Sequence, residues 1–301
     1  MSTRKFIVLG TASQVPTRHR NHNGYFLKWD DEGILFDPGE GTQRQMILAN
    51  VSATEITKIC LTHFHGDHCL GLAGVLQRLS LDNVPHAVEI YYPASGQQYF
   101  ENLRDASIYY NTAKLVPRPI TTPGIIWQNE KFALETQPLA HSVESWGYRW
   151  QEKTTVTMLP EKLAELGIRG AEVGVLKRDR KLEKDGRVIS LAEVSVPKVG
   201  QSMAFVMDTR RCEAALTLAR EVSLLVCEST YLATEQSEAE SRGHLTAQQA
   251  AQIAKDAQAK LLVLTHFSQR YNSIDDFVRE AYPIHPNVIA VQDGDVVVIP
   301  K

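Results

Sequence analysis

The segment Thr62–His68 carries four potential metal ligands within six residues, in the order His63, His65, Asp67 and His68. Imidazole and carboxylate groups are the ligands that zinc and similar divalent metals prefer. Their spacing does not fit one face of a helix; it fits a sharply turning loop after a strand, and Gly66 would permit the turn. A single histidine would indicate a solvated loop, but four such groups would crowd one another without a cation. The sequence therefore predicts a metal site.

Three further candidate ligands stand where apolar, strand-like runs end: His141, Asp208 and His266. Sites in sheet proteins often form at the edge where strands end, so these residues are expected to lie near the first loop. Each one alone would be a structural residue or a cap. Together with the first loop they give five histidines and two aspartates, enough for two metal ions with open positions.

The H-x-H-x-D-H segment, followed by separate His, Asp and His residues, resembles the metallo-β-lactamase superfamily. Further segments resemble the ribonuclease Z family within it, in the family's order and over most of the chain: Leu9–Ala12, Pro16–Asn21, Phe36–Gln43, Asp208–Arg210, Glu228–Thr230, Gly243–Thr246 and His266–Tyr271. The resemblance implies an α/β fold, the αββα sandwich, in which two mixed β-sheets carry helices on both outer faces. It also implies a zinc-dependent endoribonuclease that removes the 3′ trailer of precursor tRNA.

Residue by residue, the resemblance implies two zinc ions per chain. One would be held by His63, His65 and His141. The other would be held by Asp67, His68 and His266. Asp208 would bridge both ions, and Asp37 would hold a ligand histidine in one tautomer; the alternative for Asp37 is a turn residue before Pro38 and Gly39.

The same resemblance implies the roles of three residues in phosphodiester hydrolysis. Asp67 would orient the attacking hydroxide and accept its proton. His244 would protonate the leaving 3′ oxygen, and Glu228 would hold its imidazole. From the residues alone, His244 could instead be a surface residue before a helix.

Several residues are candidates for contacts with RNA phosphates. Ser268 and Arg270 lie just beyond His266, and a hydroxyl and a guanidinium both suit phosphate oxygens. Arg18 and Arg20, with His19 between them, form a small basic cluster that resembles a family segment near the RNA end. An exposed polar turn and a solvated loop are the respective alternatives.

The segment Glu152–Lys198 is charged and interrupts the strand pattern, so we expect an excursion from a single domain spanning residues 1–301. It occupies the place of the family's flexible arm, which grips the tRNA body. Its basic run contains Lys177, Arg178, Arg180 and Lys181, and such runs bind phosphates with little sequence preference. Many bacterial relatives carry a Pro- and Gly-rich turn there, whereas Ile168–Gly174 lacks the proline. A mobile solvated loop is the alternative.

Periodicity predicts the elements that position these residues. Strands are expected at Lys5–Leu9, Tyr25–Trp29, Ile34–Phe36, Ile59–Thr62, Val88–Tyr92, Met203–Met207, Leu224–Cys227 and Leu261–Leu264. A strand, a turn and a second strand are expected within Lys131–Gln151. Helices are expected at Gly71–Leu81, Gln97–Arg104 and Cys212–Arg220.

Two local signals are more specific. Thr246 with Gln249 matches a capping box, which predicts a helix from Thr246 through Ala257. Ile289–Val291 and Val296–Ile299 flank Asp293-Gly294, a pair typical of a tight turn, so a β-hairpin is expected there.

The chain has 301 residues, 43% hydrophobic and 22% charged, which favours a folded α/β protein over a disordered one. Its formal net charge of −3 argues mildly against non-specific nucleic-acid binding but allows a local basic patch. The cysteines Cys60, Cys69, Cys212 and Cys227 form no C-x-x-C pair and are expected in the core. No apolar run approaches bilayer length and Met1–Gly10 lacks signal-peptide features, so no membrane partner and a cytoplasmic location are expected. A homodimer is expected from the resemblance alone.

Two alternatives remain open at the level of sequence. One is another hydrolase of the superfamily, either a phosphodiesterase or an exoribonuclease, or an enzyme acting on a thioester or lactam. The other is an inactive RNA- or protein-binding paralogue, although such a protein should have lost some of the seven ligands, and all seven positions are filled.

Overall fold

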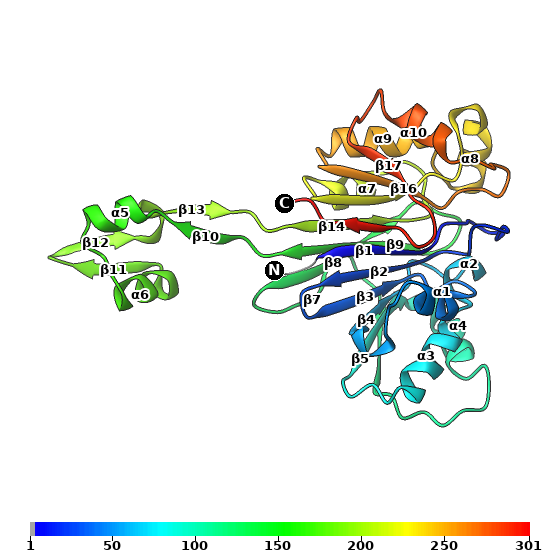
Figure 1. Ribbon diagram of the computed structural model, residues 1–301, viewed down its shortest axis with the longest axis horizontal. Coiled ribbons are helices and arrows are strands. Elements are labelled where there is room, and N and C mark those ends of the chain that lie inside the picture. The colour runs from blue at the N-terminus through cyan, green and yellow to red at the C-terminus, as the bar shows by residue number, and fades with distance from the viewer. Residues whose placement is uncertain (1–3) are drawn as a thin grey trace.

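The computed structural model describes residues 4–301, so the first three residues of Met1–Gly10 lie outside it. The described residues form four layers, in which two β-sheets face each other and helices cover both outer faces (Figure 1). An elongated arm projects from one end. The αββα sandwich predicted from the resemblance is confirmed. No helix in the described range is long and apolar enough to cross a membrane.

Within residues 4–301, each sheet of the sandwich has seven strands, and both sheets are mixed. The first sheet runs β18 (Val296–Val298), β1 (Lys5–Gly10), β2 (Gly24–Trp29), β3 (Glu32–Phe36), β4 (Lys58–Cys60), β5 (Val88–Pro93) and β6 (Leu115–Ile120). The second runs β17 (Val288–Ala290), β16 (Leu261–Thr265), β15 (Leu224–Glu228), β14 (Ser202–Val206), β9 (Ser145–Glu152), β8 (Phe132–Leu139) and β7 (Gly124–Gln128).

Each sheet has helices of its own on the outer face (Figure 1). The first sheet carries α1 (Thr42–Leu48), α3 (Leu72–Leu81) and α4 (Gln97–Arg104), with the one-turn helix α2 (Gly66–Cys69) at its edge. The second carries α7 (Glu213–Ala219), α8 (Gln236–Arg242), α9 (Ala247–Asp256) and α10 (Asp275–Ala281). Short 3-10 turns occur at Ala53–Glu55, Ala94–Gly96, Leu191–Glu193 and Ala233–Glu235.

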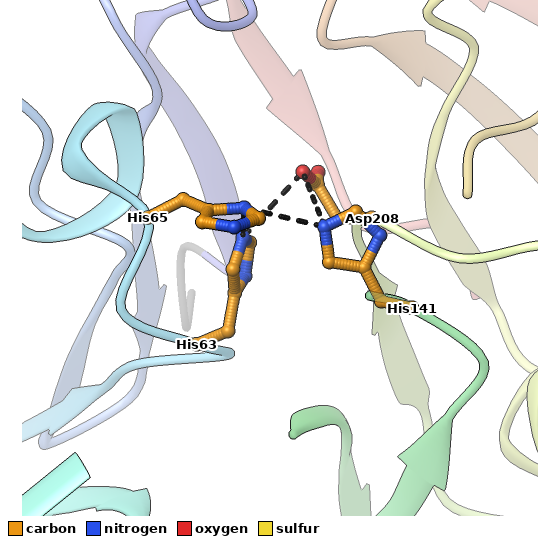
Figure 2. Close-up of side chains that lie close together, drawn as sticks. All are labelled: His63, His65, His141 and Asp208. Carbon is orange, nitrogen blue, oxygen red and sulfur yellow. Dashed lines mark hydrogen bonds and ion pairs between the residues drawn. The ribbon is translucent and has the colours of Figure 1, made fainter. Parts of the chain in front are cut away.

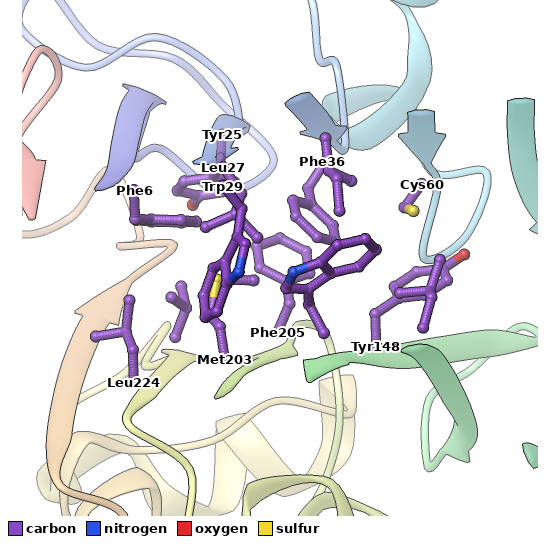
Figure 3. Close-up of a cluster of buried hydrophobic side chains, with 14 of the residues drawn as sticks. Phe6, Tyr25, Leu27, Trp29, Phe36, Cys60, Tyr148, Met203, Phe205 and Leu224 are labelled. Carbon is purple, nitrogen blue, oxygen red and sulfur yellow. The ribbon is translucent and has the colours of Figure 1, made fainter. Parts of the chain in front are cut away.

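The strands read as continuous apolar runs because both faces of each sheet are buried. In β1, Phe6 points into the core between the sheets, whereas Ile7 points toward the helices of the first sheet. Figure 3 shows Tyr25 and Phe36 of the first sheet facing Phe205 of the second. The rings of Phe36 and Phe205 stack with centroids 4.6 Å apart, and burying each such side chain contributes about 1.5–3 kcal/mol. This core fixes the distance between the sheets and hence between the residues at their edges.

The arm leaves the sandwich between β9 and β14 (Figure 1). Its stem is the antiparallel pair β10 (Thr155–Met158) and β13 (Ser195–Lys198). Its far part holds α5 (Pro160–Glu165), α6 (Ala171–Asp179) and the pair β11 (Lys181–Lys184) and β12 (Arg187–Ser190). A small apolar cluster of its own holds the far part together: Ile168, Leu176, Ile189, Leu191 and Val194.

Arg4 ties the root of the arm to the sandwich. Its guanidinium donates hydrogen bonds to Glu152 at 2.6 Å and to Gln201 at 2.8 Å, the residues on either side of the arm. It also pairs with Asp30 at 2.6 Å and lies over the ring of Trp29. Glu152 and Gln201 are themselves neighbours, since the backbone N–H of Glu152 donates to the carbonyl of Gln201 at 2.9 Å. The two ends of the arm therefore meet at one anchored point.

The predicted hairpin around Asp293-Gly294 is wrong. A turn does form there, with Gly294 at φ +90°. However, β17 pairs in parallel with β16 in the second sheet, whereas β18 pairs antiparallel with β1 in the first. The turn therefore carries the chain from one sheet to the other.

The capping box forms as predicted, and three of the four cysteines are buried as predicted. The Thr246 hydroxyl accepts from the backbone N–H of Gln249, whose side chain accepts from the backbone of Thr246, and α9 follows. The four cysteines of the described chain are free; Cys60, Cys69 and Cys227 are buried and Cys212 is partly buried.

Candidate metal centre

The seven predicted ligands meet where strands of both sheets end. His63 and His65 follow β4, and Asp67 and His68 lie in α2. The other three follow strands of the second sheet: His141 after β8, Asp208 after β14 and His266 after β16. Residues more than 200 positions apart in the sequence thus form one cluster, and the face-to-face sheets bring them together.

One ligand group consists of His63, His65, His141 and Asp208, whose ligand atoms all lie within 4.8 Å of one another. Figure 2 shows the three imidazoles and the carboxylate converging on one point. Nε2 of His63 lies 2.9 Å from Nδ1 of His65, and Nε2 of His141 lies 3.2 Å from the same atom. His65 therefore presents Nδ1 to this point, whereas His63 and His141 present Nε2.

The second group consists of Asp67, His68 and His266. An Asp67 oxygen lies 3.3 Å from Nε2 of His68 and 3.5 Å from Nε2 of His266. Asp208 stands between the groups, since its Oδ2 is 3.6 Å from His63 and 3.3 Å from His68. Its Oδ1 is 3.2 Å from Nε2 of His266. This is the arrangement expected of a bridging carboxylate.

The cluster fits divalent cations. Oδ1 of Asp208 and Nε2 of His266 are buried, and although they lie 3.2 Å apart, neither has a hydrogen-bond partner within the described chain. Buried polar atoms without partners are costly. Burial lowers the pKa of His68, but the charges of Asp208 and Asp67 outweigh it and raise the pKa well above its usual value. The carboxylates therefore favour a positive charge at this place. Neutral imidazoles and ionised carboxylates are the forms that ligate metal.

The expected sharp loop at Gly66 is wrong in detail. Residues 66–69 form the single helical turn α2, with His65 at its N-cap. Gly66 is not among the residues with positive φ, so no left-handed backbone requires a glycine there. The side chains of Asp67 and His68, on consecutive residues of this turn, reach the second ligand group while His63 and His65 serve the first.

Backbone strain gathers at this edge. Asp37, Asp208 and His266 have φ of +43°, +37° and +63°, although none is a glycine. A non-glycine residue in the left-handed region costs about 1–2 kcal/mol. All three follow strands, at β3, β14 and β16, and all three lie in the cluster. The surrounding core holds them in this conformation, and each turn directs a polar side chain toward the centre.

Asp37 orients two of the ligand histidines. Its Oδ2 accepts from Nδ1 of His68 at 2.9 Å and from the hydroxyl of Thr62 at 2.8 Å. The Thr62 oxygen lies 3.0 Å from Nδ1 of His63. A proton on Nδ1 leaves Nε2 free to ligate metal, which is the role that the resemblance implies for Asp37 toward one histidine.

The buried Glu228 and the partly buried His244 form a hydrogen-bonded pair beside the cluster. Nδ1 of His244 donates to Oε1 of Glu228 at 3.0 Å, and Glu228 is fully buried at the end of β15. Burial lowers the pKa of His244, but the charges of Glu228 and Asp208 and the hydrogen bond to Glu228 outweigh it and raise the pKa to about 9. The raised pKa favours the protonated imidazole, and Nε2 is the ring nitrogen that Glu228 leaves free to donate a proton.

Comparison with known proteins identifies the family. A family model described as the metallo-beta-lactamase superfamily matches residues 17–144. The chain is 56% identical over 282 residues to the ribonuclease Z of Nocardia farcinica, covering 93% of this chain and 92% of that protein. It is 47% identical over 293 residues to the ribonuclease Z of Chlamydia pneumoniae, covering 97% and 95%. The chain belongs to the ribonuclease Z family.

A solved structure agrees with this membership. The short form of human tRNase Z matches with a TM-score of 0.74 and 26% identity, covering 99% of this chain and 100% of that one. As a ribonuclease Z family member, the chain is a hydrolytic endoribonuclease of the metallo-β-lactamase superfamily. The fold implies binding of divalent metal, and groups of histidine and aspartate that could hold it are present.

A cavity of about 420 Å³ opens over the metal ligands of this ribonuclease Z family member. Asp67, His244 and Asp208 line it together, and Ser268 and Arg270 form part of its wall. Arg270 is engaged, since its guanidinium pairs with Glu238 at 2.7 Å and lies over a tyrosine ring, that of Tyr231. Ser268 is largely buried, and its oxygen accepts from the backbone of Arg270 at 3.5 Å.

The other basic residues predicted to contact RNA lie outside this cavity. Arg18 is exposed and lines a neighbouring cavity of about 370 Å³, which Arg44 also lines. Arg20 is buried, and its guanidinium donates to the carbonyls of Ser268 and Tyr271, so it ties two loops together. The basic residues of the arm are exposed far from the cluster, on α6, at its C-cap and at the start of β11 (Figure 1): Lys177, Arg178, Arg180 and Lys181.

Three groups at the site were not singled out from the sequence. Thr62 lies between Asp37 and His63, and Thr230 lies between Glu228 and His266. The carbonyl of Gly243 accepts from Nδ1 of His141 at 2.9 Å. Only their positions could have pointed to the two threonines, since each lies within two residues of a site residue in a segment that resembles the family.

Proposed function

We propose that this chain is a zinc-dependent endoribonuclease that removes the 3′ trailer of precursor tRNA. Water would add to the phosphodiester bond at the 3′ end of the tRNA, leaving a 3′-hydroxyl on the tRNA and a 5′-phosphate on the trailer. The observation that carries this proposal is one cavity lined by residues of both ligand groups and by His244, which is hydrogen-bonded to the buried Glu228. The names of the relatives, ribonuclease Z and tRNase Z, support RNA and tRNA as the substrate.

The donor set favours two zinc ions. Five imidazoles and two carboxylates form a nitrogen-rich set of the kind that zinc prefers over magnesium or calcium. The first ion would be held by His63, His65 and His141, and the second by Asp67, His68 and His266, with Asp208 shared. When bound, such ions supply Lewis acidity at the scissile phosphate and a nucleophile at neutral pH.

Two side chains of this protein would carry out the proton transfers. Asp67 lines the cavity between the ligand groups, where its carboxylate can orient the attacking water and accept a proton. His244 lines the same cavity, protonated and held through Nδ1 by Glu228, so Nε2 can donate to the leaving 3′ oxygen. Positioned acid–base groups of this kind typically contribute about 10²–10⁴-fold to the rate.

Phosphate contacts complete the proposal. Ser268 and Arg270 would meet RNA oxygens at the cavity wall, and Arg18 would do so beside it. The basic residues of the arm would grip the tRNA body at a distance from the scissile bond. Arg20 would act by holding the loop that carries Arg18, because its own guanidinium is bonded to backbone carbonyls.

A homodimer and a cytoplasmic location stay predictions of the resemblance; light scattering of the purified chain tests the dimer.

The decisive experiment is end-mapping of a 3′-extended precursor tRNA incubated with the protein and zinc. We expect one cut at the tRNA–trailer junction, with a 3′-hydroxyl on the tRNA fragment. Asp67→Ala should lower the rate by at least about 10²-fold, since it removes both a ligand and the proposed base. Asp31→Ala, a change at an exposed aspartate, is the matched control.

Bis(p-nitrophenyl) phosphate and a β-lactam are assayed beside the tRNA, together with the metal content of the protein. Stepwise shortening of the trailer would indicate an exoribonuclease. Hydrolysis of the small diester or the lactam without tRNA cleavage would indicate another hydrolase of the superfamily. Near-normal turnover by Asp67→Ala with both metals bound would remove the role proposed for Asp67.

A further inference from the structure

The hydroxyl of Thr230 lies at the meeting point of the metal ligands and the proton-donating pair. Thr230 is 2% exposed and lies two residues beyond Glu228, the last residue of β15. Its oxygen is 2.6 Å from Oε2 of Glu228 and 2.7 Å from Nδ1 of His266. It is also 3.3 Å from Nδ1 of His244. No role for this residue follows from the ligand set or from the proposed acid and base.

The direction of each hydrogen bond can be assigned. A hydroxyl has one proton to donate, and an ionised carboxylate can only accept. Thr230 therefore donates to Glu228 and accepts from Nδ1–H of His266. This fixes the His266 tautomer with its proton on Nδ1 and leaves the lone pair of Nε2 directed at the second ligand group. The buried Nε2 of His266 has no hydrogen-bond partner in the described chain, as a metal-facing atom should.

The same hydrogen bond also fixes the carboxylate. With Oε2 held by the Thr230 hydroxyl, Oε1 of Glu228 is left for Nδ1 of His244 at 3.0 Å and for the backbone N–H of Thr209 at 2.8 Å. The carboxylate cannot rotate without breaking several of these bonds. One buried acid thus orients two imidazoles, His244 directly and His266 through the threonine.

The opposite side of the cluster has the same construction. Asp37 holds His68 directly and reaches His63 through the hydroxyl of Thr62. The two carboxylates come from different sheets, at the ends of β3 and β15. Because two unrelated segments arrive at one arrangement, the threonine link is a feature of the site's construction and not an incidental contact.

We propose that Thr230 is a positioning residue that couples the metal ligand His266 to the proton donor His244 through Glu228. The proposal rests on the proposed function of the chain and deepens it. Removing the hydroxyl leaves Nδ1 of His266 and Oε2 of Glu228 without this partner in a buried place. Losing a group that hydrogen-bonds to a metal ligand typically costs about 10–100-fold in metal affinity or activity.

The test uses the full chain with zinc as the probe. Thr230→Val keeps the shape of the side chain and removes the hydroxyl, whereas Thr230→Ser keeps the hydroxyl. Competition with a chromophoric chelator should show one of two zinc ions bound about 10–100-fold more weakly in the valine variant, and restored binding in the serine variant. Thr136→Val is the matched control, since Thr136 is fully buried and donates to a backbone carbonyl, that of Gly147.

Kinetics at saturating zinc gives a second readout. The valine variant should lose kcat on precursor tRNA with little change in KM, because the hydroxyl, although Thr230 lines the cavity, is engaged by Glu228 and His266. Wild-type zinc affinity together with wild-type kcat in Thr230→Val would overturn the proposal. That result would leave trailer removal by the wild-type chain intact, so the two failures are distinguishable.

The wild-type chain supplies a measurement that does not depend on a variant folding. Nitrogen-15 spectra of the zinc-loaded protein report which ring nitrogen of each histidine carries the proton. We expect the proton of His266 on Nδ1 and in a hydrogen bond. A proton found on Nε2 of His266 would contradict the assigned direction of every bond around Thr230, and the proposal with it.

Discussion

At the scale of single residues, the His244–Glu228 pair gives the reaction its expected dependence on pH. The charge of Glu228 helps to raise the pKa of His244 to about 9 despite burial. A base whose pKa is raised keeps its proton through neutral pH and loses it as the pH rises through that value. We therefore expect kcat of the wild-type chain to fall as the pH rises through about 9.

Two substitutions test this assignment in pH–rate profiles. His244→Ala should lower kcat by about 10²–10⁴-fold and remove the alkaline fall. Glu228→Gln removes a charge that raises the His244 pKa, so the fall should move to lower pH. His285→Ala, outside the cavity, is the control and should leave the profile unchanged. If His244→Ala keeps the wild-type alkaline fall, another group delivers the proton.

The sequence was sufficient to select the seven residues that meet in the cluster and, through the resemblance, Asp37 and Glu228, but it did not reveal every group that orients them. His63, His65, Asp67 and His68 stand out because four ligand-type side chains within six residues would repel one another unless a cation held them. Thr230 and Gly243 give no such signal, because a threonine or a backbone carbonyl acquires its role through a partner distant in sequence. Arg20 shows the same limit, since its charge suggested RNA while its hydrogen bonds go to carbonyls.

At the scale of elements, the sequence predicted most of the strands and helices, but it predicted the pairing of the strands only in part. Apolar runs indicated β1, β14 and β16 because both faces of each sheet are buried. The Asp293-Gly294 turn was also readable, but a turn does not specify which strands its flanks join. β17 pairs with β16, and β18 pairs with β1. The strands of each pair are too far apart in the sequence for local residue patterns to predict the pairing.

The capping box of α9 is an element whose contribution can be measured. Thr246 caps the helix that follows His244, and it is 1% exposed. Thr246→Ala should lower the free energy of unfolding by about 0.5–2 kcal/mol, because an N–H at the helix start loses its acceptor. Urea denaturation at fixed zinc concentration measures this as a lower midpoint with an unchanged slope.

Gln248→Ala is the control for the capping experiment. Gln248 lies in the same helical turn, is exposed and makes no capping contact, so its change should stay within about 0.5 kcal/mol. Equal midpoints for Thr246→Ala and Gln248→Ala would show that the cap contributes nothing measurable.

At the scale of the whole molecule, the proposed function assigns tRNA binding to the arm and hydrolysis to the sandwich. Its apolar cluster is distinct from the cores of the sandwich, and its two ends meet at the Arg4 anchor. Because Glu152 and Gln201 are already cross-strand neighbours, a two-residue Asn-Gly turn can replace residues 153–200 without moving β9 or β14. We expect this variant to hydrolyse bis(p-nitrophenyl) phosphate normally and to bind precursor tRNA weakly. An equal loss of diester hydrolysis and of tRNA binding would show that the arm has a structural role.

The basic residues of the arm can be tested without removing it. Replacing Lys177, Arg178, Arg180 and Lys181 with alanine should flatten the dependence of tRNA affinity on salt. For each phosphate that the variant no longer binds, the slope of log affinity against log salt should fall in magnitude by about 0.7–0.9. Lys255→Ala and Arg279→Ala, on α9 and α10 of the sandwich, are the controls. An unchanged slope in the arm variant would show that other residues make the phosphate contacts.

The division of the ligands between two sheets has a consequence during synthesis. A nascent chain that has emerged as far as residue 144 already displays His63, His65, Asp67, His68 and His141. It still lacks Asp208 and His266, and β1 still lacks its neighbour β18. Such a partly synthesised chain has the three histidines proposed for one ion, but it lacks the carboxylate proposed to be shared and one ligand proposed for the other ion. Both ligand groups, and with them the proposed nuclease activity, can therefore be complete only after residue 266 has been synthesised.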